Sequence, residues 1–298
     1  MRILVVGGTG LIGEHIVRQL AGGGHDVAVF HRGQTAVVLP QGVREILDPL
    51  SVMPIVKFPK QLFDFAPEVV VHTMAMGESD AQAVVGAFAG KAERLVMLSS
   101  GDVYRAYGLL TGIETGPIEE GLLSESSPLR TIRFPYRKRA ASPRSLEYWY
   151  DKILAEQAVL SSRGIRGIAL RIPKVYGRRG NADLATIYRY RHQPNWRWTH
   201  GYVENVAAAV VLAATRSIVP SHIYNVGEEH TPTVAERLAW MPPSALEPDL
   251  KSGFNFAQNI AYDTSRIRDE LGYQEIVPEE EALLRTLRSC STEAAPSY

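Results

Sequence analysis

Two side chains four residues apart, Tyr148 and Lys152, offer acid–base chemistry. Within one helix, a spacing of four places both side chains on the same face. A phenol with a pKa of about 10 is a poor base at neutral pH, but an adjacent ammonium group stabilises the phenolate and lowers that pKa. Tyr150 is the competing tyrosine, but it has no lysine four residues later. We therefore predict that Tyr148 is the acid–base group and that Lys152 activates it.

Ser100 follows an apolar run, residues 95–99, that predicts a buried strand. At the carboxyl end of that strand, its hydroxyl is expected to donate a hydrogen bond to the substrate oxygen, which completes a Ser-Tyr-Lys set. Asp102 is a further candidate acid–base group, and its alternative role is to cap or brace the following turn. Hydride transfer at a carbon that bears oxygen needs such a proton partner. The sequence therefore predicts an oxidoreductase.

A glycine-rich turn follows the first apolar run of the chain. It consists of Gly7, Gly8, Thr9, Gly10, Leu11, Ile12 and Gly13. Between a strand and a helix, the first glycine of such a turn permits a tight bend, the second lets backbone approach a pyrophosphate, and the third lets the helix pack on the strand. The helix N-terminus then faces the phosphates. We predict that these residues bind a dinucleotide.

The end of the second apolar run, residues 27–30, indicates which dinucleotide binds. An Asp or Glu at this place would bind the ribose 2′-hydroxyl of NAD. This chain has His31 and Arg32 instead, and an arginine accommodates a 2′-phosphate. We predict NADP as the preferred cofactor and NAD as the alternative; a solvated loop arginine is the competing interpretation of Arg32. Asp48 either accepts a hydrogen bond from the adenine amino group or forms an ordinary turn.

Short β-branched runs alternate with helical patterns through most of the chain, as in a parallel sheet covered by helices. The expected strands are residues 3–6, 27–30, 43–47, 69–72, 95–99, 167–172 and 222–226. The expected helices are residues 11–20, 80–89, 145–162, 204–214 and 278–287. We predict an α/β fold with a doubly wound, mostly parallel Rossmann sheet, whose ligand crevice lies at the carboxyl ends of the strands.

Two regions interrupt this alternation. Residues 107–144 are rich in Gly, Pro, Ser and Arg and predict a long loop or lid, too polar for the core, over the crevice. Residues 174–200 and 228–298 have weaker periodicity, and we assign them to a smaller C-terminal α+β substrate-binding domain. Residues 1–173 and 201–227 are then expected to form the Rossmann dinucleotide-binding domain.

Composition excludes several classes of protein. A chain of 298 residues with 45% hydrophobic content buries a substantial core. Lys plus Arg and Asp plus Glu number 32 each, so no net charge attracts nucleic acid or an anionic membrane. A single cysteine, Cys290, excludes an intrachain disulfide framework and a cysteine-rich metal site, and we predict no metal site. No apolar run reaches the roughly 18 residues of a membrane-spanning helix, and we expect a cytoplasmic protein.

Several motifs of the chain resemble those of the extended short-chain dehydrogenase/reductases, the NAD-dependent epimerase/dehydratase family. The resemblance spans nearly the whole chain and rests on the glycine-rich turn, Tyr148 with Lys152, and residues 99–104, 170–177, 202–207, 224–227 and 263–273. It implies the serine, tyrosine and lysine roles given above. It also implies a sugar-nucleotide or related polyhydroxy substrate, and a homodimer through the helices at 80–89 and 145–162.

The resemblance adds residues to both sites. It assigns to the cofactor site Ser99, Thr73, Met74, Ala75, Pro173 and Val175. Lys174 stands where nucleotide-sugar epimerases carry an asparagine, but a lysine still meets phosphate as a point charge. Gly101 stands where sugar dehydratases carry one of their two acid–base groups. We therefore favour redox chemistry or epimerisation over dehydration. We assign Lys174, Arg179 and Tyr202 to substrate binding, because guanidinium groups pair with anions and a tyrosine ring lines a pocket by stacking.

The predicted function is redox chemistry at a hydroxyl or carbonyl carbon with NADP or NAD. The protein is either an epimerase that returns the hydride to the substrate or an NADPH-dependent reductase of a small aldehyde or ketone. Residues 30–33 and 263–267 also resemble family members related to chloroplast stem-loop RNA-binding proteins. Balanced charge and the lack of an aromatic-basic platform disfavour a nucleic-acid partner. A cofactor-sensing protein without turnover is the remaining alternative.

Overall fold

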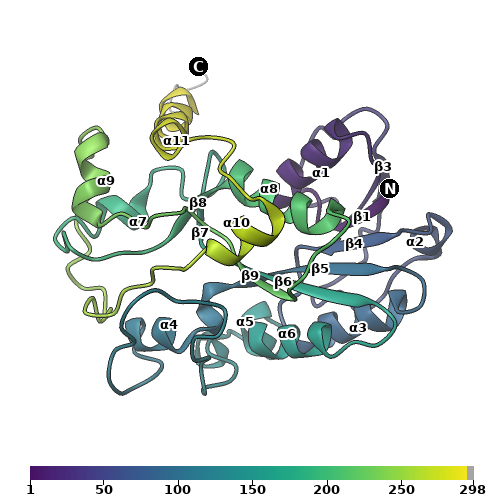
Figure 1. Ribbon diagram of the computed structural model, residues 1–298, viewed down its shortest axis with the longest axis horizontal. Coiled ribbons are helices and arrows are strands. Elements are labelled where there is room, and N and C mark those ends of the chain that lie inside the picture. Colours follow the sequence, from purple (N-terminus) through teal and green to yellow (C-terminus); the bar gives the residue numbers. More distant parts are fainter. Residues whose placement is uncertain (294–298) are drawn as a thin grey trace.

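The computed structural model describes residues 1–293. Within these residues, seven parallel strands form one sheet in the order β3-β2-β1-β4-β5-β6-β9 (Figure 1). The strands are β1 (Arg2–Val6), β2 (Asp26–His31), β3 (Arg44–Leu47), β4 (Val69–His72), β5 (Arg94–Ser100), β6 (Arg166–Ile172) and β9 (Ile223–Asn225). The chain leaves β1 toward β2 on one side and later returns to its other side as β4, so a ligand crevice forms at the carboxyl ends of these strands. The predicted doubly wound α/β fold is confirmed.

Helices cover both faces of this sheet (Figure 1). One face carries α1 (Leu11–Gly22), α8 (Val203–Thr215) and α10 (Ser265–Leu271). The other face carries α2 (Lys60–Asp64), α3 (Glu78–Phe88) and α6 (Lys152–Leu160). The helices α3 and α6 lie side by side. Each face buries its own apolar cluster, because successive strand residues point to opposite sides of the sheet. The homodimer expected through α3 and the helical region at 145–162 stays a prediction.

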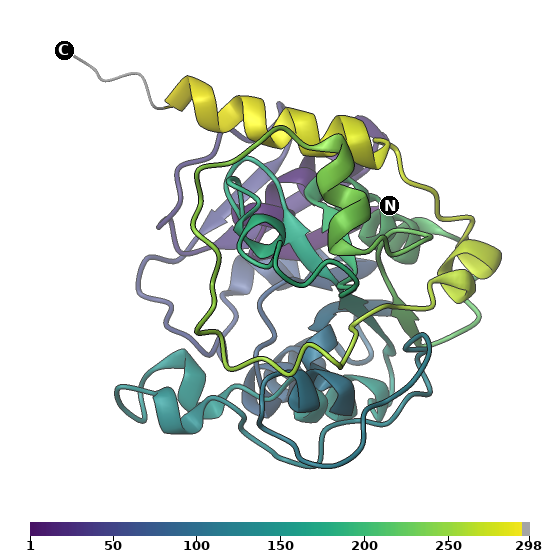
Figure 2. The same cartoon turned by 90° about the vertical axis from the view of Figure 1, so that its left-hand side faces the viewer.

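The remaining elements gather beyond the carboxyl ends of the strands (Figure 1). They are η1 (Gly101–Val103), α4 (Arg105–Leu110), η2 (Arg137–Arg139), α5 (Leu146–Trp149), β7 (Lys174–Tyr176), α7 (Ala185–Tyr188), β8 (His200–Tyr202), α9 (Val234–Trp240) and α11 (Glu279–Glu293). The strands β7 and β8 pair in parallel as a second, small sheet. Figure 2 shows the teal segment that contains α5 projecting from the body. None of the described helices is both long and apolar enough to cross a bilayer.

The division of the chain into two domains stays a prediction. After β6 the chain forms both strands of the small sheet, β7 and β8, then returns to the main sheet with α8 and β9, and leaves it again at α9. Residues 294–298, which belong to the last predicted segment of the substrate-binding domain, lie outside the described residues.

The helix predicted over residues 145–162 is wrong. The chain forms α5, leaves the helical conformation at Tyr150 and Asp151, and begins α6 at Lys152. Asp151 has extended backbone, with φ −157° and ψ 99°, and its carboxylate accepts hydrogen bonds from the backbone N–H groups of Ile153 and Leu154. An aspartate in this conformation is a helix N-cap, so the first helix ends before it and a new one starts after it.

The predicted lid is also more ordered and more buried than its composition suggests. The helix α4 begins before residue 107, and Leu109, Leu110 and Leu123 are all buried. Leu110 and Leu123 belong to an apolar cluster that also contains Trp196, which lies between α7 and β8. The expectation that residues 107–144 are too polar for a core element is therefore wrong for the first part of this segment.

The close approach of α1 to β1 requires glycine at position 13. A Cβ there would stand 2.3 Å from the Gly7 carbonyl oxygen and 2.8 Å from the Gly8 Cα, and neither backbone atom moves freely. We expect Gly13→Ala to lower the free energy of unfolding by about 2–3 kcal/mol through overpacking. It should also weaken dinucleotide binding, because the glycine-rich turn must shift. Thermal unfolding and titration with NADPH measure the two effects.

Gly86→Ala is the matched control. Gly86 lies within α3, and a Cβ there would meet nothing within 4 Å. Alanine has a higher helix propensity than glycine, so this substitution should raise the free energy of unfolding by up to about 1 kcal/mol. Wild-type stability in Gly13→Ala would contradict the close packing of α1 on β1.

Candidate active site

A cavity of about 120 Å³ opens above the glycine-rich turn, and we call it the dinucleotide cavity. It is lined by Gly7, Thr9, Gly10, Phe30, His31, Arg32, Gln34, Thr35, Met53, Ile55 and Met74. The structure therefore brings together much of the predicted cofactor site, which comes from the carboxyl ends of β1, β2 and β4. Thr73 lies beside it and donates a hydrogen bond from Oγ1 to the Val6 carbonyl oxygen at 2.9 Å.

The geometry of the turn fits a dinucleotide pyrophosphate. Gly7 has φ +87°, and a Cβ there would stand 2.3 Å from the Thr73 Oγ1, so only glycine fits. At Gly10 a Cβ would meet only the Gly7 carbonyl oxygen, at 3.6 Å, which leaves the turn open on that side. No side chain of the described residues caps the start of α1. The first N–H groups of α1 are therefore free to bind phosphate oxygens.

The residues at the ends of β2 and β3 have different roles. The His31 Nε2 lies 2.8 Å from Glu45 Oε1, and His31 Nδ1 accepts a hydrogen bond from the Gly33 N–H, so this imidazole braces its own turn. Arg32 lines the dinucleotide cavity, and its guanidinium has no hydrogen-bond or ion-pair partner among the described side chains, residues 1–288. Asp48 accepts a hydrogen bond from the Leu50 N–H at 3.1 Å, which favours its turn-forming role.

A second cavity, of about 240 Å³, lies at the carboxyl ends of β5 and β6, and we call it the reaction pocket. It is lined by Ser100, Gly101, Asp102, Tyr107, Tyr136, Tyr150, Ile172, Pro173, Lys174, Trp198 and Tyr262. The structure thus brings together four residues of the predicted sites, namely Ser100, Asp102, Pro173 and Lys174. The phenol beside them belongs to Tyr150.

Asp102 is the buried carboxyl group of the reaction pocket. The Tyr136 hydroxyl donates a hydrogen bond to Asp102 Oδ2 at 3.0 Å, and the Asp102 N–H donates to Ser100 Oγ at 3.2 Å. Burial raises the pKa of Asp102, while the charge of Arg130 opposes this rise. Burial, followed by the negative charge of Asp102, raises the pKa of Tyr150 well above its usual value. The Tyr150 phenol therefore carries its proton at neutral pH.

The structure does not bring Tyr148 to this pocket. Its ring packs against Trp149, with ring centroids 4.9 Å apart, and the Arg137 guanidinium lies 4.7 Å from its centroid. The Tyr148 carbonyl oxygen accepts a hydrogen bond from Arg137 Nε at 3.1 Å. The prediction that Tyr148 and Lys152 share one helix face is wrong, because α5 ends between them.

Lys152 is buried at the carboxyl ends of β4 and β5. Its Nζ donates hydrogen bonds to the carbonyl oxygens of Ala75 at 2.7 Å and Leu98 at 2.9 Å. Burial lowers the pKa of Lys152 to about 8, while the negative charges of Asp80 and Asp102 oppose this fall. This ammonium group therefore joins two strand ends and does not stand among the residues that line the reaction pocket.

Ser99, which we predicted for the cofactor site, is buried in a polar network. Its hydroxyl donates to Glu156 Oε1 at 2.5 Å, and Arg171 donates two hydrogen bonds to the same carboxylate, at 3.0 and 2.8 Å. The Arg171 guanidinium also lies 4.8 Å from the ring centroid of Tyr104. The network joins β5, β6 and α6, so the structure gives Ser99 a part in holding the strand that carries Ser100.

Two residues predicted to bind substrate lie elsewhere. Arg179 and Tyr202 line a separate cavity together with Leu11, and Arg179 pairs with Glu14 at 2.8 Å. Ile12 and Val175, predicted for the cofactor site, are partly buried against the apolar core. The structure does not bring any of these side chains to the reaction pocket.

The sequence did not predict most of the aromatic wall of the reaction pocket. Tyr107 and Tyr136 come from the segment expected to be a lid, and Tyr262 comes from a segment beyond β9. A Cβ on Gly101 would stand 1.5 Å from the Tyr262 hydroxyl oxygen, so the glycine makes room for this ring. The glycine at position 101 was thus a signal of close packing there, but it did not identify Tyr262 as the neighbour. Among the side chains that the structure describes, those of residues 1–288, we find no cluster of His, Cys, Asp or Glu that could hold a metal ion.

The chain is similar to a known family and to a curated protein. The model of the NAD dependent epimerase/dehydratase family matches residues 3–227. The 2′-dehydrokanamycin reductase of Streptomyces kanamyceticus is 27% identical over 191 residues, which are 62% of this chain and 45% of that protein. The chain thus spans less than half the length of that relative.

Solved structures share the fold over nearly the whole chain. The UDP-glucose 4-epimerase of Thermotoga maritima gives a TM-score of 0.70 at 18% identity, covering 98% of this chain and 99% of that one. The UDP-glucuronic acid 4-epimerase of Bacillus cereus gives 0.68 at 18% identity, covering 98% and 100%. The UDP-glucose 4-epimerase of Thermus thermophilus gives 0.66 at 22% identity, covering 99% and 100%.

The family match begins at β1 and ends just after β9, so it includes the glycine-rich turn and both strands that end at the reaction pocket. Each strand of the main sheet except β1, which starts one residue earlier, lies wholly within that match. The chain belongs to the NAD dependent epimerase/dehydratase family.

Proposed function

We propose that the protein is an NADP-dependent oxidoreductase that reduces a carbonyl group on a small polyhydroxy substrate. One observation carries this proposal: Ser100, Asp102 and Tyr150 line a single cavity at the sheet edge that also holds the glycine-rich turn. A carbonyl oxygen between the hydroxyls of Ser100 and Tyr150 would accept hydrogen bonds from both. The curated relative, 2′-dehydrokanamycin reductase, supports reduction as the direction of the reaction.

Tyr150 is the proton donor in this mechanism. The glycine-rich turn and Arg32 would hold NADPH, which would supply the hydride for the carbonyl carbon. The phenolic proton of Tyr150 passes to the carbonyl oxygen, while Ser100 holds that oxygen with a hydrogen bond. Tyr150 holds its proton at neutral pH, so a proton is present to donate, and the raised pKa makes this phenol a weaker acid than a free tyrosine. Asp102 Oδ1 is buried and has no hydrogen-bond partner among the described residues, so the carboxyl group acts on the neighbouring Tyr150 through its charge.

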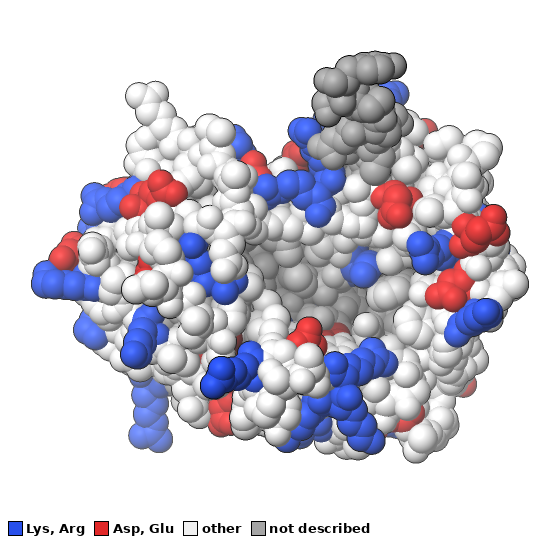
Figure 3. All heavy atoms as spheres, turned by 180° about the vertical axis from the view of Figure 1, so that it is seen from behind, with Lys and Arg blue, Asp and Glu red and all other residues white. Residues whose placement is uncertain are grey.

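Arg32 supports NADP over NAD. Its guanidinium lines the dinucleotide cavity without a protein partner among residues 1–288, and such a group pairs with the two oxygens of a 2′-phosphate. The face shown in Figure 3 is hollowed at its centre, and both basic and acidic side chains lie around the hollow. NAD stays the alternative, because the solved structures from Bacillus cereus and Thermus thermophilus contain NAD.

The size and lining of the reaction pocket support a substrate with one sugar-sized ring. Its volume is about 240 Å³, and its tyrosine hydroxyls offer hydrogen bonds around a ring that stacks on Trp198. The Lys174 ammonium lies 5.6 Å from the Trp198 ring centroid and forms no hydrogen bond or ion pair within the described residues. It is therefore free to meet a substrate oxygen. A sugar nucleotide stays the alternative substrate, with its phosphate at Lys174.

Tyr150→Phe is expected to lower kcat for NADPH-dependent reduction by about 10²- to 10⁴-fold, because only the transferred proton is lost. The affinity for NADPH should stay unchanged. Tyr148→Phe is the matched control and should keep kcat near the wild-type value, since its ring packs outside the pocket. The measurement is NADPH consumption with a panel of aldoses and ketoses. If Tyr148→Phe lost activity while Tyr150→Phe kept it, the acid–base group would be Tyr148 and not Tyr150.

Arg32→Gln is expected to raise the Kd for NADPH about 10- to 100-fold, the effect of one charge-assisted hydrogen-bond pair. The Kd for NADH should change little, because NADH lacks the 2′-phosphate. Fluorescence titration of both dinucleotides measures this ratio. Arg163→Gln, in the exposed turn after α6, is the control. An equal loss for NADPH and NADH would contradict the role given to Arg32.

The dinucleotide released by heating the purified protein distinguishes a reductase from an epimerase. A weakly held, exchangeable NADPH is expected, because a reductase must replace its cofactor after each hydride transfer. A tightly held NAD would instead support an epimerase, which returns the hydride to its substrate. Mass and absorbance of the released ligand decide between them. If neither NADPH nor NADH binds the apo protein, the proposed function is wrong.

A further inference from the structure

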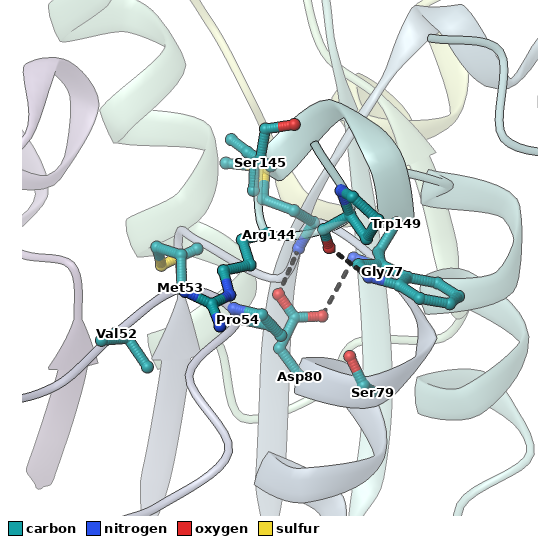
Figure 4. A pocket seen from close by; sticks show the side chains of 12 residues that line it. Val52, Met53, Pro54, Gly77, Ser79, Asp80, Arg144, Ser145 and Trp149 are labelled. Atoms are coloured by element: carbon teal, nitrogen blue, oxygen red, sulfur yellow. Dashed lines mark hydrogen bonds between the residues drawn. The ribbon is translucent and has the colours of Figure 1, made fainter. Parts of the chain in front are cut away.

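Each reduction consumes the phenolic proton of Tyr150, so a proton must return to this oxygen before the next turnover. The backbone on both sides of Tyr150 is held in place. The Trp149 carbonyl oxygen lies against Gly77, where a Cβ would stand 2.5 Å from it (Figure 4). The Asp151 N–H donates a hydrogen bond to the Met76 carbonyl oxygen at 3.0 Å. The proton must therefore reach the phenol where it stands in the pocket.

Lys152 is not placed to return this proton. The hydrogen bonds of its Nζ go to two backbone carbonyl oxygens, those of Ala75 and Leu98, at 2.7 and 2.9 Å. Lys152 is also not one of the residues that line the reaction pocket. The group that supplies a proton to Tyr150 must instead belong to the lining of that pocket.

Asp102 and Tyr136 form a hydrogen-bonded pair beside this phenol. The Tyr136 hydroxyl donates to Asp102 Oδ2 at 3.0 Å, and the Tyr136 and Tyr150 rings pack together with their centroids 5.1 Å apart. Burial and then the charge of Asp102 raise the pKa of Tyr150, so this carboxyl group interacts with the phenol. One end of the pair therefore faces the group that has lost its proton.

The other end of the pair leads toward solvent. Asp102 is buried, whereas Tyr136 is partly exposed. Tyr136 directly precedes η2, and Lys138 and Arg139 of that turn are exposed. A hydroxyl both donates and accepts, so it passes one proton inward while it takes another from water. Burial raises the pKa of Asp102, which makes this carboxylate a better proton acceptor than an exposed one.

We propose, on the basis of the function proposed above, that Tyr136 and Asp102 form a relay that returns a proton to Tyr150 after each reduction. The Asp102 carboxylate takes the hydroxyl proton of Tyr136, and Tyr136 takes a proton from solvent. The Asp102 carboxyl group then gives its proton to the phenolate oxygen of Tyr150. One proton enters from solvent for each proton that the substrate oxygen receives, and all three side chains end as they began.

Tyr136→Phe is expected to separate the first turnover from those that follow. The full-length variant is mixed in a stopped-flow instrument with excess NADPH and the ketose that the wild type reduces fastest. One equivalent of NADPH should be consumed at the wild-type rate, because Tyr150 still holds its proton. Later turnovers should be about 10²-fold slower, which is the effect of one positioned proton-transfer group.

Two further measurements separate a relay from a structural role. Imidazole is a small acid that reaches the pocket from solvent, and it should speed the later turnovers of Tyr136→Phe without changing its first turnover. Tyr148→Phe is the matched control and should show the wild-type rate in both phases, with no response to imidazole, because its ring packs outside the pocket.

Three results would overturn the relay. The first is a Tyr136→Phe variant whose first turnover is slowed as much as the later ones, which would mean that Tyr136 only shapes the pocket. The second is an unchanged steady-state rate in this variant. The third is a slow second phase that imidazole does not speed. Each leaves the proposed function intact, because the wild type still consumes NADPH; a wild type that neither binds a dinucleotide nor consumes NADPH is the separate result that overturns that function.

Discussion

The buried carboxylate of Asp151 connects α6 to residues 130–134 at the edge of the reaction pocket. One of its oxygens accepts hydrogen bonds from the first turn of α6, and the other accepts from the Phe134 N–H at 2.8 Å. Arg130 lies 3.9 Å away, and both side chains are fully buried. Because Asp151 caps α6, the chain before it is extended, and Tyr150 joins the pocket while Tyr148 packs outside it.

The same group is connected to the acid–base chemistry. Arg130 donates a hydrogen bond from Nε to the backbone carbonyl oxygen of Asp102, and its charge opposes the rise in the pKa of the Asp102 carboxyl group. Breaking one partner of a buried ion pair leaves an uncompensated charge that costs several kcal/mol. Three features therefore depend on one another: the cap of α6, the position of residues 130–134, and the charge of the Asp102 carboxyl group beside Tyr150. A change at Asp151 alters all three.

The sequence was sufficient for the parallel sheet, whose seven strands were predicted to within one residue at each end. Their signal is local, since a buried strand is a short β-branched run between turns. The break between α5 and α6 was not predictable in this way. The helical pattern continues through Asp151, and its capping role depends on Phe134 and Arg130, which lie more than a dozen residues earlier. Tyr136 and Tyr262 reach the pocket from segments that lie far from Ser100 in the sequence, so no local spacing predicts them.

The wall opposite Ser100 is built from three separate passes of the chain. Lys174 follows β6, Trp198 precedes β8, and Tyr262 comes only after the chain has returned to the main sheet as α8 and β9. A crossover between two related genes at any point between Lys174 and Tyr262 would therefore combine walls from two parents, which have not been selected to fit one substrate. Exchange of a terminal cassette is a poor route to new specificity in such an architecture. Point substitutions on the individual passes are the route by which its substrate range can diverge.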